Sequence, residues 1–260
     1  METIMPPDHP FPPPSGARPA LGLIGAGAFG AFCIPHLARH FRVHAFDPAR
    51  DVAGLARQHD VRAATLAEAA AQPVVVLAMP VRAIGAVAHA IAPHLRPGCL
   101  VLDVCSLKAR PLATLARILP PFVDIVGTHP LFGPQSGRDG IAGLRIALCA
   151  VRGRREAAVA RFLRCQLGLK VIRTTADEHD RQMAYVQGLT HLIARTVMAM
   201  GMPRLDQTTA TFDHLMRMVD TVRHDSDALF RTIAMENPFA GAVKAEFFAA
   251  ARQLEAALER

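Results

Sequence analysis

Hydrophobic residues follow two different patterns along the chain, and the change between them falls near residue 175. Before that point, short and nearly continuous apolar runs alternate with stretches of helical periodicity, such as Ile84 to Leu95. Continuous runs are typical of strands buried on both faces, and their alternation with helices predicts an α/β fold with a doubly wound, mostly parallel sheet. The predicted strands are LGLIGAG from Leu21, RVHAFD to Asp47, PVVVLAMP to Pro80, GCLVLDVCS to Ser106, FVDIVGTHP to Pro130, RIALCAV to Val151 and LKVIRTT to Thr175.

The strand pattern stops after Thr175, and the remaining residues predict helices. The first of these is apolar nearly all round, so we expect it to be buried on more than one side. A helical part of ~85 residues with so much apolar surface is marginal alone, which favours a C2 homodimer that completes its core. The predicted helices are Ala184–Met200, Phe212–Val222, Ser226–Met235 and Val243–Glu259, the last with Val243, Phe247, Leu254 and Leu258 on one stripe.

These patterns divide the chain into three parts. Residues 1–17 are rich in proline and lack the basic and apolar regions of a signal peptide, so we expect a disordered or polyproline-like tail. Residues 18–175 form the predicted α/β domain, and residues 176–260 form the predicted helical dimerisation and substrate domain. No window of ~20 apolar residues without charges occurs, so neither a membrane span nor a membrane partner is expected.

Composition narrows the range of partners. The chain of 260 residues has a net charge of +7, but its Lys and Arg residues are scattered, and it contains one Tyr and no Trp. That pattern argues against nucleic-acid binding and suits a field that attracts a small anionic substrate. The five cysteines have no C-x-x-C spacing, which indicates a reducing cytoplasm and no metal site.

The first predicted strand leads into a glycine-rich loop, LGLIGAGAFG. Gly25, Gly27 and Gly30 have the G-x-G-x-x-G spacing at the head of a helix, where they would allow a tight turn, a close approach of a pyrophosphate and close helix packing. Together with an acidic residue about 20 positions further on, this context predicts a Rossmann dinucleotide-binding domain. The predicted contacts in the loop are Gly25, Ala26, Gly27, Ala28, Phe29 and Gly30.

Asp47, at the end of the second predicted strand, decides between cofactors. A carboxylate there accepts hydrogen bonds from a ribose 2′-hydroxyl and repels a 2′-phosphate, which favours NAD. Arg50 lies three residues on and could turn toward a phosphate, so NADP stays possible. The alternative role for Asp47 is to cap an Asp-Pro turn.

Three predicted strands end in residues that could take part in binding or catalysis. Ligands of open α/β sheets bind outside the carboxyl ends of the strands. Met79 with Pro80, Ser106 followed by Lys108, and His129 all stand at such ends. We therefore expect Met79, Pro80 and Ser106 to border the cofactor, with Ser106 and His129 at the reaction site.

Four blocks of the sequence together resemble the prephenate/arogenate dehydrogenases. The resemblance runs in collinear order from about Leu21 to Leu254, and residues 127–230 are similar to the arogenate-type branch of plants. It implies oxidative decarboxylation of arogenate or prephenate in tyrosine biosynthesis, in which hydride passes to the nicotinamide and CO2 leaves. The blocks are GTHPLFGPQSGRDG from Gly127, DVCSLKA from Asp103, DEHDRQMAYVQGLTHL from Asp177 and FDHLMRMVDTVRHDSDALF from Phe212.

The resemblance also implies roles for individual side chains. His129 would bond the ring hydroxyl and take its proton, because an unperturbed imidazole titrates near the working pH, and Ser106 would hold both groups in register. Taken alone, His129 could instead cap a turn before Pro130. His191 and Gln187 match a Q-x-x-x-H pair that would donate to a substrate carboxylate, or they could satisfy one another at a dimer core.

The chain departs from many relatives where an Arg would hold the ring carboxylate. Asp213 and His214 stand in that helix, with Arg217 about one turn further on as the candidate to bind the substrate. Asp225 could pair with the ammonium of arogenate and repel the keto acid prephenate. Its alternative role is to cap the following helix together with Ser226. His179 and Asp180, at the domain junction, are expected to be architectural.

Two other readings compete with this function. A pyrroline-carboxylate or β-hydroxyacid reductase would share the layout, but such enzymes commonly use a Lys in the helical domain, where this chain has Lys244 in its last helix, without a matching block. A non-catalytic NAD-binding module would need no strand-end His, so the presence of Ser106, His129 and His191 together argues against it.

Overall fold

The computed structural model describes residues 18–259, so the predicted Pro-rich tail lies outside the described residues. The chain forms two compact units, the first ending at Ala176 and the second beginning at Asp177. The domain boundary predicted between residues 175 and 176 lies beside this division.

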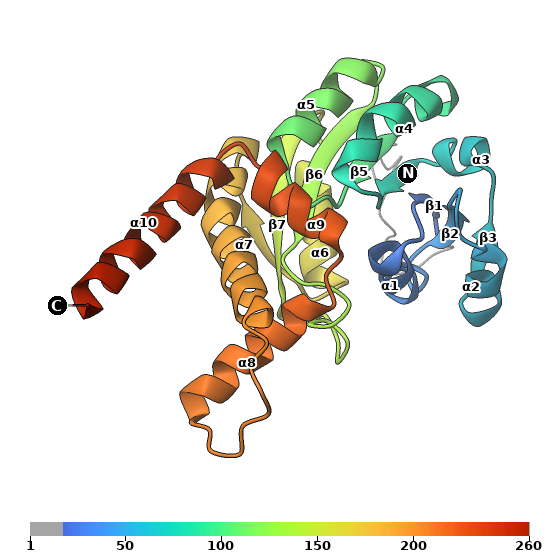
Figure 1. Cartoon of the computed structure of the whole chain (residues 1–260). Helices are drawn as coiled ribbons and strands as arrows, with labels where there is room; N and C mark the ends of the chain where they lie inside the picture. Colours follow the sequence, from blue (N-terminus) through green and yellow to red (C-terminus); the bar gives the residue numbers. More distant parts are fainter. Residues whose placement is uncertain (1–17, 260) are drawn as a thin grey trace. The chain divides into compact units, whose positions relative to one another are not determined.

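The first unit is built on an eight-stranded sheet with the order β3-β2-β1-β4-β5-β6-β7-β8 (Figure 1). Neighbouring strands are parallel except for β6 and β7, which are antiparallel. This confirms the predicted doubly wound, mostly parallel α/β sheet. The strands are β1 (Ala20–Ile24), β2 (Arg42–Phe46), β3 (Val61–Ala63), β4 (Val74–Leu77), β5 (Leu100–Asp103), β6 (Asp124–Pro130), β7 (Arg145–Arg152) and β8 (Lys170–Arg173).

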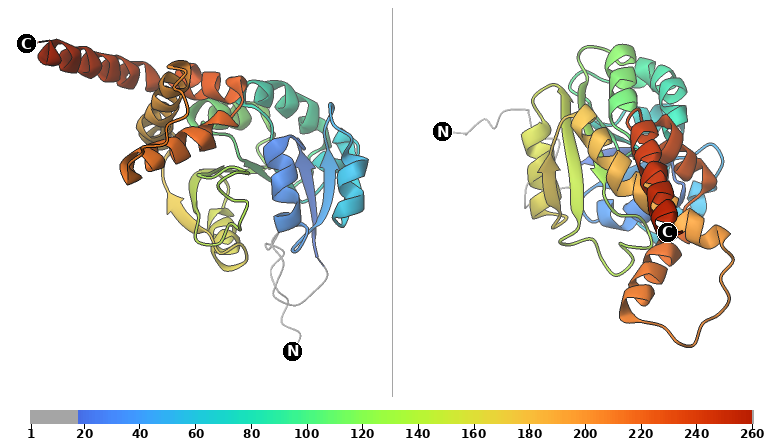
Figure 2. Two further views of the ribbon diagram at one scale, coloured as in Figure 1. Left: turned by 60° about the horizontal axis from the view of Figure 1, so that its bottom comes forward. Right: turned by 60° about the vertical axis from the view of Figure 1, so that its left-hand side comes forward.

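Helices cover both faces of this sheet, which explains why its strands read as continuous apolar runs (Figure 2). Along β4, Val74 and Val76 belong to one core cluster, whereas Val75 and Leu77 belong to the other, because successive side chains of a strand point to opposite faces. Residues of α1 and α6 join the first cluster, and residues of α3, α4 and α5 join the second. The helices are α1 (Ala28–Leu37), α2 (Val52–Gln58), α3 (Leu66–Ala70), α4 (Ile84–Ile91), α5 (Ala109–Ile118) and α6 (Glu156–Cys165), with short 3-10 turns at Val81–Ala83 and Ala92–His94.

The second unit consists of helices: α7 (Ala176–Ala199), α8 (Ala210–Arg223), α9 (Asp227–Arg231), a π-helical turn (Thr232–Glu236) and α10 (Ala240–Leu258). The first predicted helix begins eight residues too late, because the polar start of α7 hides its periodicity. The helix predicted at Ser226–Met235 is two elements, α9 and the π turn.

Much apolar surface of the second unit is exposed in a single chain. In the single chain α7 buries one face, which includes Met183 and Ala194, whereas Val186 is 59% exposed. The burial of α7 on more than one side therefore stays a prediction for the dimer. On α10, Val243 is buried, but Leu254 and Leu258 are 61% and 79% exposed. Among residues 18–259, no helix combines the length and apolar character needed to cross a bilayer.

Candidate functional site

The glycine loop joins β1 to α1, and two of its glycines are required by the protein's own backbone. Gly25 has a φ of 102°, and a Cβ there would lie 2.4 Å from the carbonyl oxygen of Ala78. A Cβ on Gly30 would lie 2.0 Å from the carbonyl oxygen of Gly25. Both positions therefore exclude any side chain, and the loop folds tightly against the first turn of α1.

Gly27 differs, because an added Cβ would meet nothing within 4 Å. Gly27 is also the N-cap of α1, and no side chain caps that helix end. The first N–H groups of a helix lack intrahelical partners and carry positive partial charge. The loop thus combines open space with backbone donors, an arrangement that fits the pyrophosphate of a dinucleotide.

Asp47 follows β2 and holds the loop as well as its own turn. Its Oδ2 accepts a hydrogen bond of 2.7 Å from the Ala26 amide. Its Oδ1 accepts from the amides of Ala49, at 2.8 Å, and Arg50, at 3.0 Å. The turn-capping role is therefore present. A carboxylate has about four acceptor positions, so these bonds leave room for a ribose hydroxyl.

Strands β4 and β5 end at the same level, and β6 continues three residues further, to Pro130. Asp103 pairs in register with Leu77 on one side and Gly127 on the other. Met79, Cys105 and His129 stand two residues beyond these three, and the Cys105 thiol donates to the Met79 carbonyl at 3.4 Å. The carboxyl ends of the strands thus bring the segments that contain Met79, Ser106 and His129 to one edge of the sheet.

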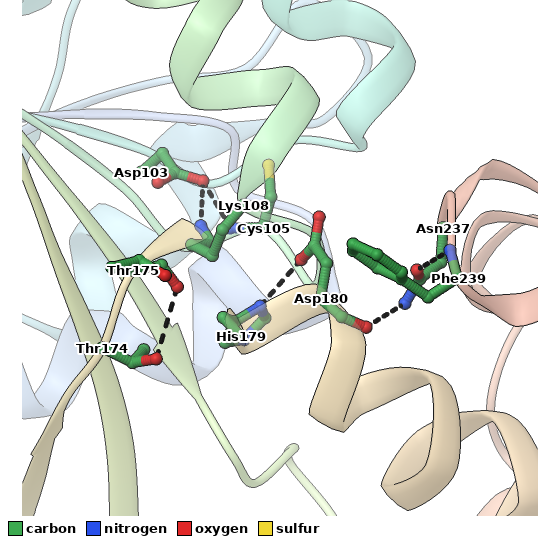
Figure 3. A network of polar contacts seen from close by, with 9 residues as sticks. All are labelled: Asp103, Cys105, Lys108, Thr174, Thr175, His179, Asp180, Asn237 and Phe239. Atoms are coloured by element: carbon green, nitrogen blue, oxygen red, sulfur yellow. Dashed lines mark hydrogen bonds and ion pairs between the residues drawn. The ribbon is translucent and has the colours of Figure 1, made fainter. Parts of the chain in front are cut away.

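Ser106 lies in the short segment between β5 and α5 and is partly buried. A buried ion pair between Asp103 and Lys108 spans this segment (Figure 3). Burial, and after it the charge of Asp103, raises the pKa of the Cys105 thiol, which keeps the thiol protonated. Cys105 is therefore an inert packing residue of the segment.

His129 belongs to β6 rather than to a turn. It pairs in register with Ala147, and the strand continues through Pro130, which pairs with Ile146. The residue is 5% exposed. The alternative role, a turn cap before Pro130, does not describe this position. Thr128, directly before it, donates to the Asp103 carbonyl at 2.7 Å, which ties the ends of β5 and β6 together.

In the second unit, His191 contacts two acceptors. Nδ1 of His191 lies 2.9 Å from the Gln187 carbonyl oxygen, and Nε2 lies 3.1 Å from Oδ2 of Asp225. The imidazole also stacks on Phe230 at a centroid distance of 6.4 Å. His191 is 6% exposed, whereas the Asp225 side chain is 35% exposed. This hydrogen bond between His191 and Gln187 uses the backbone carbonyl of Gln187.

The alternative role, an N-cap formed by Asp225 together with Ser226, holds for Ser226 and not for Asp225. Ser226 is the N-cap of α9, with its hydroxyl accepting from the Leu229 amide at 3.1 Å. Asp225 instead faces His191. Arg217 is exposed on α8. Within the described residues, no hydrogen bond or ion pair joins its guanidinium to His191 or Asp225.

Sequence reasoning missed Arg195, which lies one helical turn beyond His191 on α7. Its guanidinium lies 4.8 Å from the centroid of the Phe230 ring and donates to Asp227 at 2.7 Å. The signal was present in the spacing of Gln187, His191 and Arg195, because residues four apart share one face of a helix. The second unit therefore offers a cation beside the His191–Asp225 pair.

His179 and Asp180 form a separate buried group near the start of α7 (Figure 3). Nδ1 of His179 lies 2.8 Å from Oδ1 of Asp180, and both side chains are 1% exposed. The Asp180 carbonyl accepts from the Asn237 amide at 2.7 Å, and Asn237 in turn accepts from the Phe239 amide at 2.9 Å. These bonds connect α7 to the start of α10, so the group stabilises the second unit.

The loop, the strand order and the strand-end residues define the first unit as a Rossmann-type nucleotide-binding domain. Residues 40–144 match the family model described as prephenate dehydrogenase, nucleotide-binding domain. Over this part of its length the chain is similar to the prephenate dehydrogenases.

Two curated relatives show how far this similarity extends. Arogenate dehydrogenase 2, chloroplastic, from Arabidopsis thaliana is 32% identical over 151 residues, which cover 56% of this chain and 42% of the relative. The 4-amino-4-deoxyprephenate dehydrogenase of Streptomyces pristinaespiralis is 32% identical over 158 residues, which cover 61% of this chain and 50% of the relative. The chain spans half or less of the length of these two relatives.

A solved structure shares the whole fold. The prephenate dehydrogenase from A. aeolicus, in complex with hydroxyphenyl propionate and NAD+, has a TM-score of 0.74 and covers 95% of this chain and 92% of its own. Its sequence is 17% identical, so this similarity concerns the fold.

Proposed function

We propose that this protein is an enzyme that oxidises and decarboxylates arogenate, prephenate or both, with NAD or NADP as the hydride acceptor, in tyrosine biosynthesis. The observation that carries the proposal is the presence of a nucleotide-binding loop and of Ser106 and His129 at the carboxyl ends of one sheet, in a chain whose residues 40–144 match the prephenate dehydrogenase nucleotide-binding domain. The names of the relatives support the same reaction class.

Within this proposal, His129 is the general base. Its imidazole accepts the proton of the ring hydroxyl while the carbon that bears this hydroxyl loses hydride, and CO2 leaves the opposite carbon as the ring becomes aromatic. Burial of His129 on β6 fixes the ring and limits water around it. Ser106, on the neighbouring strand end, bonds the hydroxyl and keeps it oriented toward the imidazole.

Residues 25–30 would hold the dinucleotide, and the backbone N–H groups at the uncapped start of α1 would bind its pyrophosphate. When bound, it would supply the hydride acceptor. The open space at Gly27 and the spare acceptor capacity of Asp47 support this placement, and Asp47 favours NAD. Met79, Pro80 and Ser106, at the carboxyl edge of β4 and β5, would border the nicotinamide end.

Residues of the second unit bind the substrate's charged groups. We assign the side chain of the substrate to Asp225, with His191 and Gln187 beside it, and its carboxylates to a cation. Arg195 and Arg217 are the two candidates for that cation. If Arg195 is the anchor, Arg195→Met raises KM for the substrate at least tenfold, which corresponds to about 1.4 kcal/mol of lost binding free energy. The matched Arg217→Met then leaves KM within about threefold of the wild-type value. The reverse ranking would assign the role to Arg217.

We also propose that the protein acts as a homodimer in the cytoplasm. The exposed apolar residues of α7 and α10 support self-association, because large exposed patches of this kind mark interaction surfaces. The free cysteines support a reducing compartment. A small anionic substrate, rather than nucleic acid or a membrane, is the expected partner.

The deciding experiment measures reduction of NAD and of NADP by the purified protein with arogenate and with prephenate. Product analysis by chromatography identifies tyrosine or hydroxyphenylpyruvate. His129→Asn lowers kcat by about 10²–10⁴, the contribution of a general base, with dinucleotide affinity unchanged. No turnover of either substrate by the wild type, or a His129→Asn enzyme within threefold of it, contradicts the proposal. Activity with pyrroline carboxylate or a β-hydroxy acid alone would favour the rival reductases.

A further inference from the structure

A fully buried ion pair lies beside the proposed catalytic serine, and the reaction described above does not use it. The carboxylate of Asp103 and the ammonium of Lys108 pair at the end of β5, and both side chains are 0% exposed (Figure 3). Asp103 is the last residue of β5, and Lys108 is the N-cap of α5. The pair therefore closes a short chain segment on itself, with Ser106 inside it.

The same carboxylate holds the segment at a second point. Oδ2 of Asp103 accepts a hydrogen bond of 3.1 Å from the Cys105 amide as well as the ammonium of Lys108. One oxygen thus fixes the residue directly before Ser106 and the residue two positions after it. The Cys105 thiol adds a contact to the Met79 carbonyl on the neighbouring strand end. Ser106 has little freedom between these anchors.

Stability does not explain why two charges are placed here. Removal of a carboxylate and an ammonium from water is expensive, and well-packed apolar residues of similar volume often stabilise a fold as much or more. Oδ1 of Asp103 is buried and has no hydrogen-bond partner among the described residues, so the carboxylate is not fully compensated. A buried pair of this kind is better explained by the geometry it imposes. The attraction between its charges holds the two ends of the segment at a fixed separation.

We propose that Asp103 and Lys108 are positioning residues that hold the Ser106 hydroxyl in its reactive place. The proposal rests on the proposed function for its kinetic consequence, but not for its structural one. The pair makes no contact with substrate in this scheme and acts through Ser106 alone. A displacement of a reacting group by about 1 Å can lower a rate by about 10²-fold, which sets the expected size of the effect.

The test replaces the charged pair by neutral residues of similar size, because a single substitution would remove the oppositely charged partner of a buried group. Asp103→Asn with Lys108→Met removes the link across the segment. Asp103→Asn with Lys108→Gln keeps a hydrogen-bonding group at both ends. We expect the Met version to lower kcat about 100-fold with KM for NAD within about threefold, and the Gln version to recover at least tenfold of that loss.

A double-mutant cycle separates positioning from general damage. In a Ser106→Ala background the Met version should change kcat by less than about threefold, because the group it positions is already absent. Arg155→Met is the matched control, since Arg155 pairs with Asp124 at 3.3 Å at the start of β6, away from the carboxyl ends of the strands. It should leave kcat unchanged. Equal kcat for the Met and Gln versions overturns the proposal. So does a Met version that lowers kcat about 100-fold in the Ser106→Ala background as well.

A measurement that does not depend on enzymatic activity distinguishes the positioning proposal from the proposed function. Backbone ¹⁵N relaxation should give Cys105, Ser106 and Leu107 order parameters near 0.85 in the wild type and below about 0.6 in the Met version. Unchanged order parameters overturn the positioning proposal whatever the activity is. If the wild type turns over neither substrate but the Met version shows this loosening, only the proposed function is contradicted. If the Met version does not fold, the Gln version carries the same comparison, with smaller expected changes in kcat and in order parameters.

Discussion

Asp47 has a structural role that qualifies any experiment on cofactor choice. Its carboxylate accepts from the Ala26 amide in the glycine loop as well as from its own turn. Asp47→Asn removes the charge that repels a 2′-phosphate, but one carboxylate oxygen becomes an NH2 donor and can no longer accept these bonds. We expect a shift toward NADP of about 1–3 kcal/mol, the scale of one buried polar contact, together with weaker binding of both cofactors. The Kd values for NAD and NADP by titration calorimetry provide the check. A wild type that already prefers NADP would assign the selection to Arg50.

Asp225 offers the sharpest residue-scale test of the substrate. It pairs with His191 and is not a helix cap, so its charge faces the second unit's candidate site. A carboxylate there attracts the ammonium of arogenate and repels the keto acid prephenate. We expect wild-type kcat/KM to be at least as high for arogenate as for prephenate, and Asp225→Asn to lower this ratio about tenfold or more. Asp227→Asn, on the exposed partner of Arg195, is the control. A strong prephenate preference that Asp225→Asn does not alter would remove Asp225 from substrate selection.

At the scale of the element, the sequence predicts those features that depend on residues close to one another along the chain. The strands with continuous Val, Ile and Leu were found, whereas β3 was missed because only Val61 of its three residues is buried. The π turn after α9 was missed because its residues keep an apolar pattern close to that of an α-helix. Ser106 and His129 could be placed at strand ends from sequence. The Asp103–Lys108 pair could not, since nothing in their spacing shows that both side chains turn inward.

The edge formed by β2 and β3 contains a histidine that makes the fold sensitive to acid. Burial, and then Arg62 and Arg42, lower the pKa of His44, with a small opposing effect of Glu68. The folded-state pKa is therefore below the unfolded value, so the unfolded chain binds more protons just below pH 6.5. The contribution to stability is complete above about pH 6.5 and is lost as the pH falls through the folded-state pKa.

We accordingly expect His44→Gln to reduce the loss of unfolding free energy between pH 7.5 and pH 5.5. Urea unfolding at both pH values measures this loss, and the same substitution at the exposed His89 serves as the control. His36 and His40 also have lowered pKa values, caused by burial and Arg39, so part of the acid sensitivity should remain. An equal pH dependence in wild type and His44→Gln would show that His44 makes no contribution.

At the scale of the whole molecule, the apolar surface of the second unit decides the assembly. Leu254 and Leu258 of α10 are 61% and 79% exposed in one chain, and Val186 of α7 and Met200, directly after α7, are also more than half exposed. Burial of an exposed leucine side chain stabilises an interface by about 1.5–3 kcal/mol, so a few such residues on two symmetric copies favour association.

We expect light scattering after gel filtration to give twice the chain mass of 28.0 kDa, which is 56.0 kDa. Leu254→Glu with Leu258→Glu should convert this species to the monomer, because charges at these positions would have to be buried unpaired. Phe122→Glu, which changes an exposed apolar residue of the first unit, should leave the dimer intact. A wild type that elutes as a monomer at micromolar concentration, or a dimer that survives both α10 substitutions, would show that α10 does not form the interface.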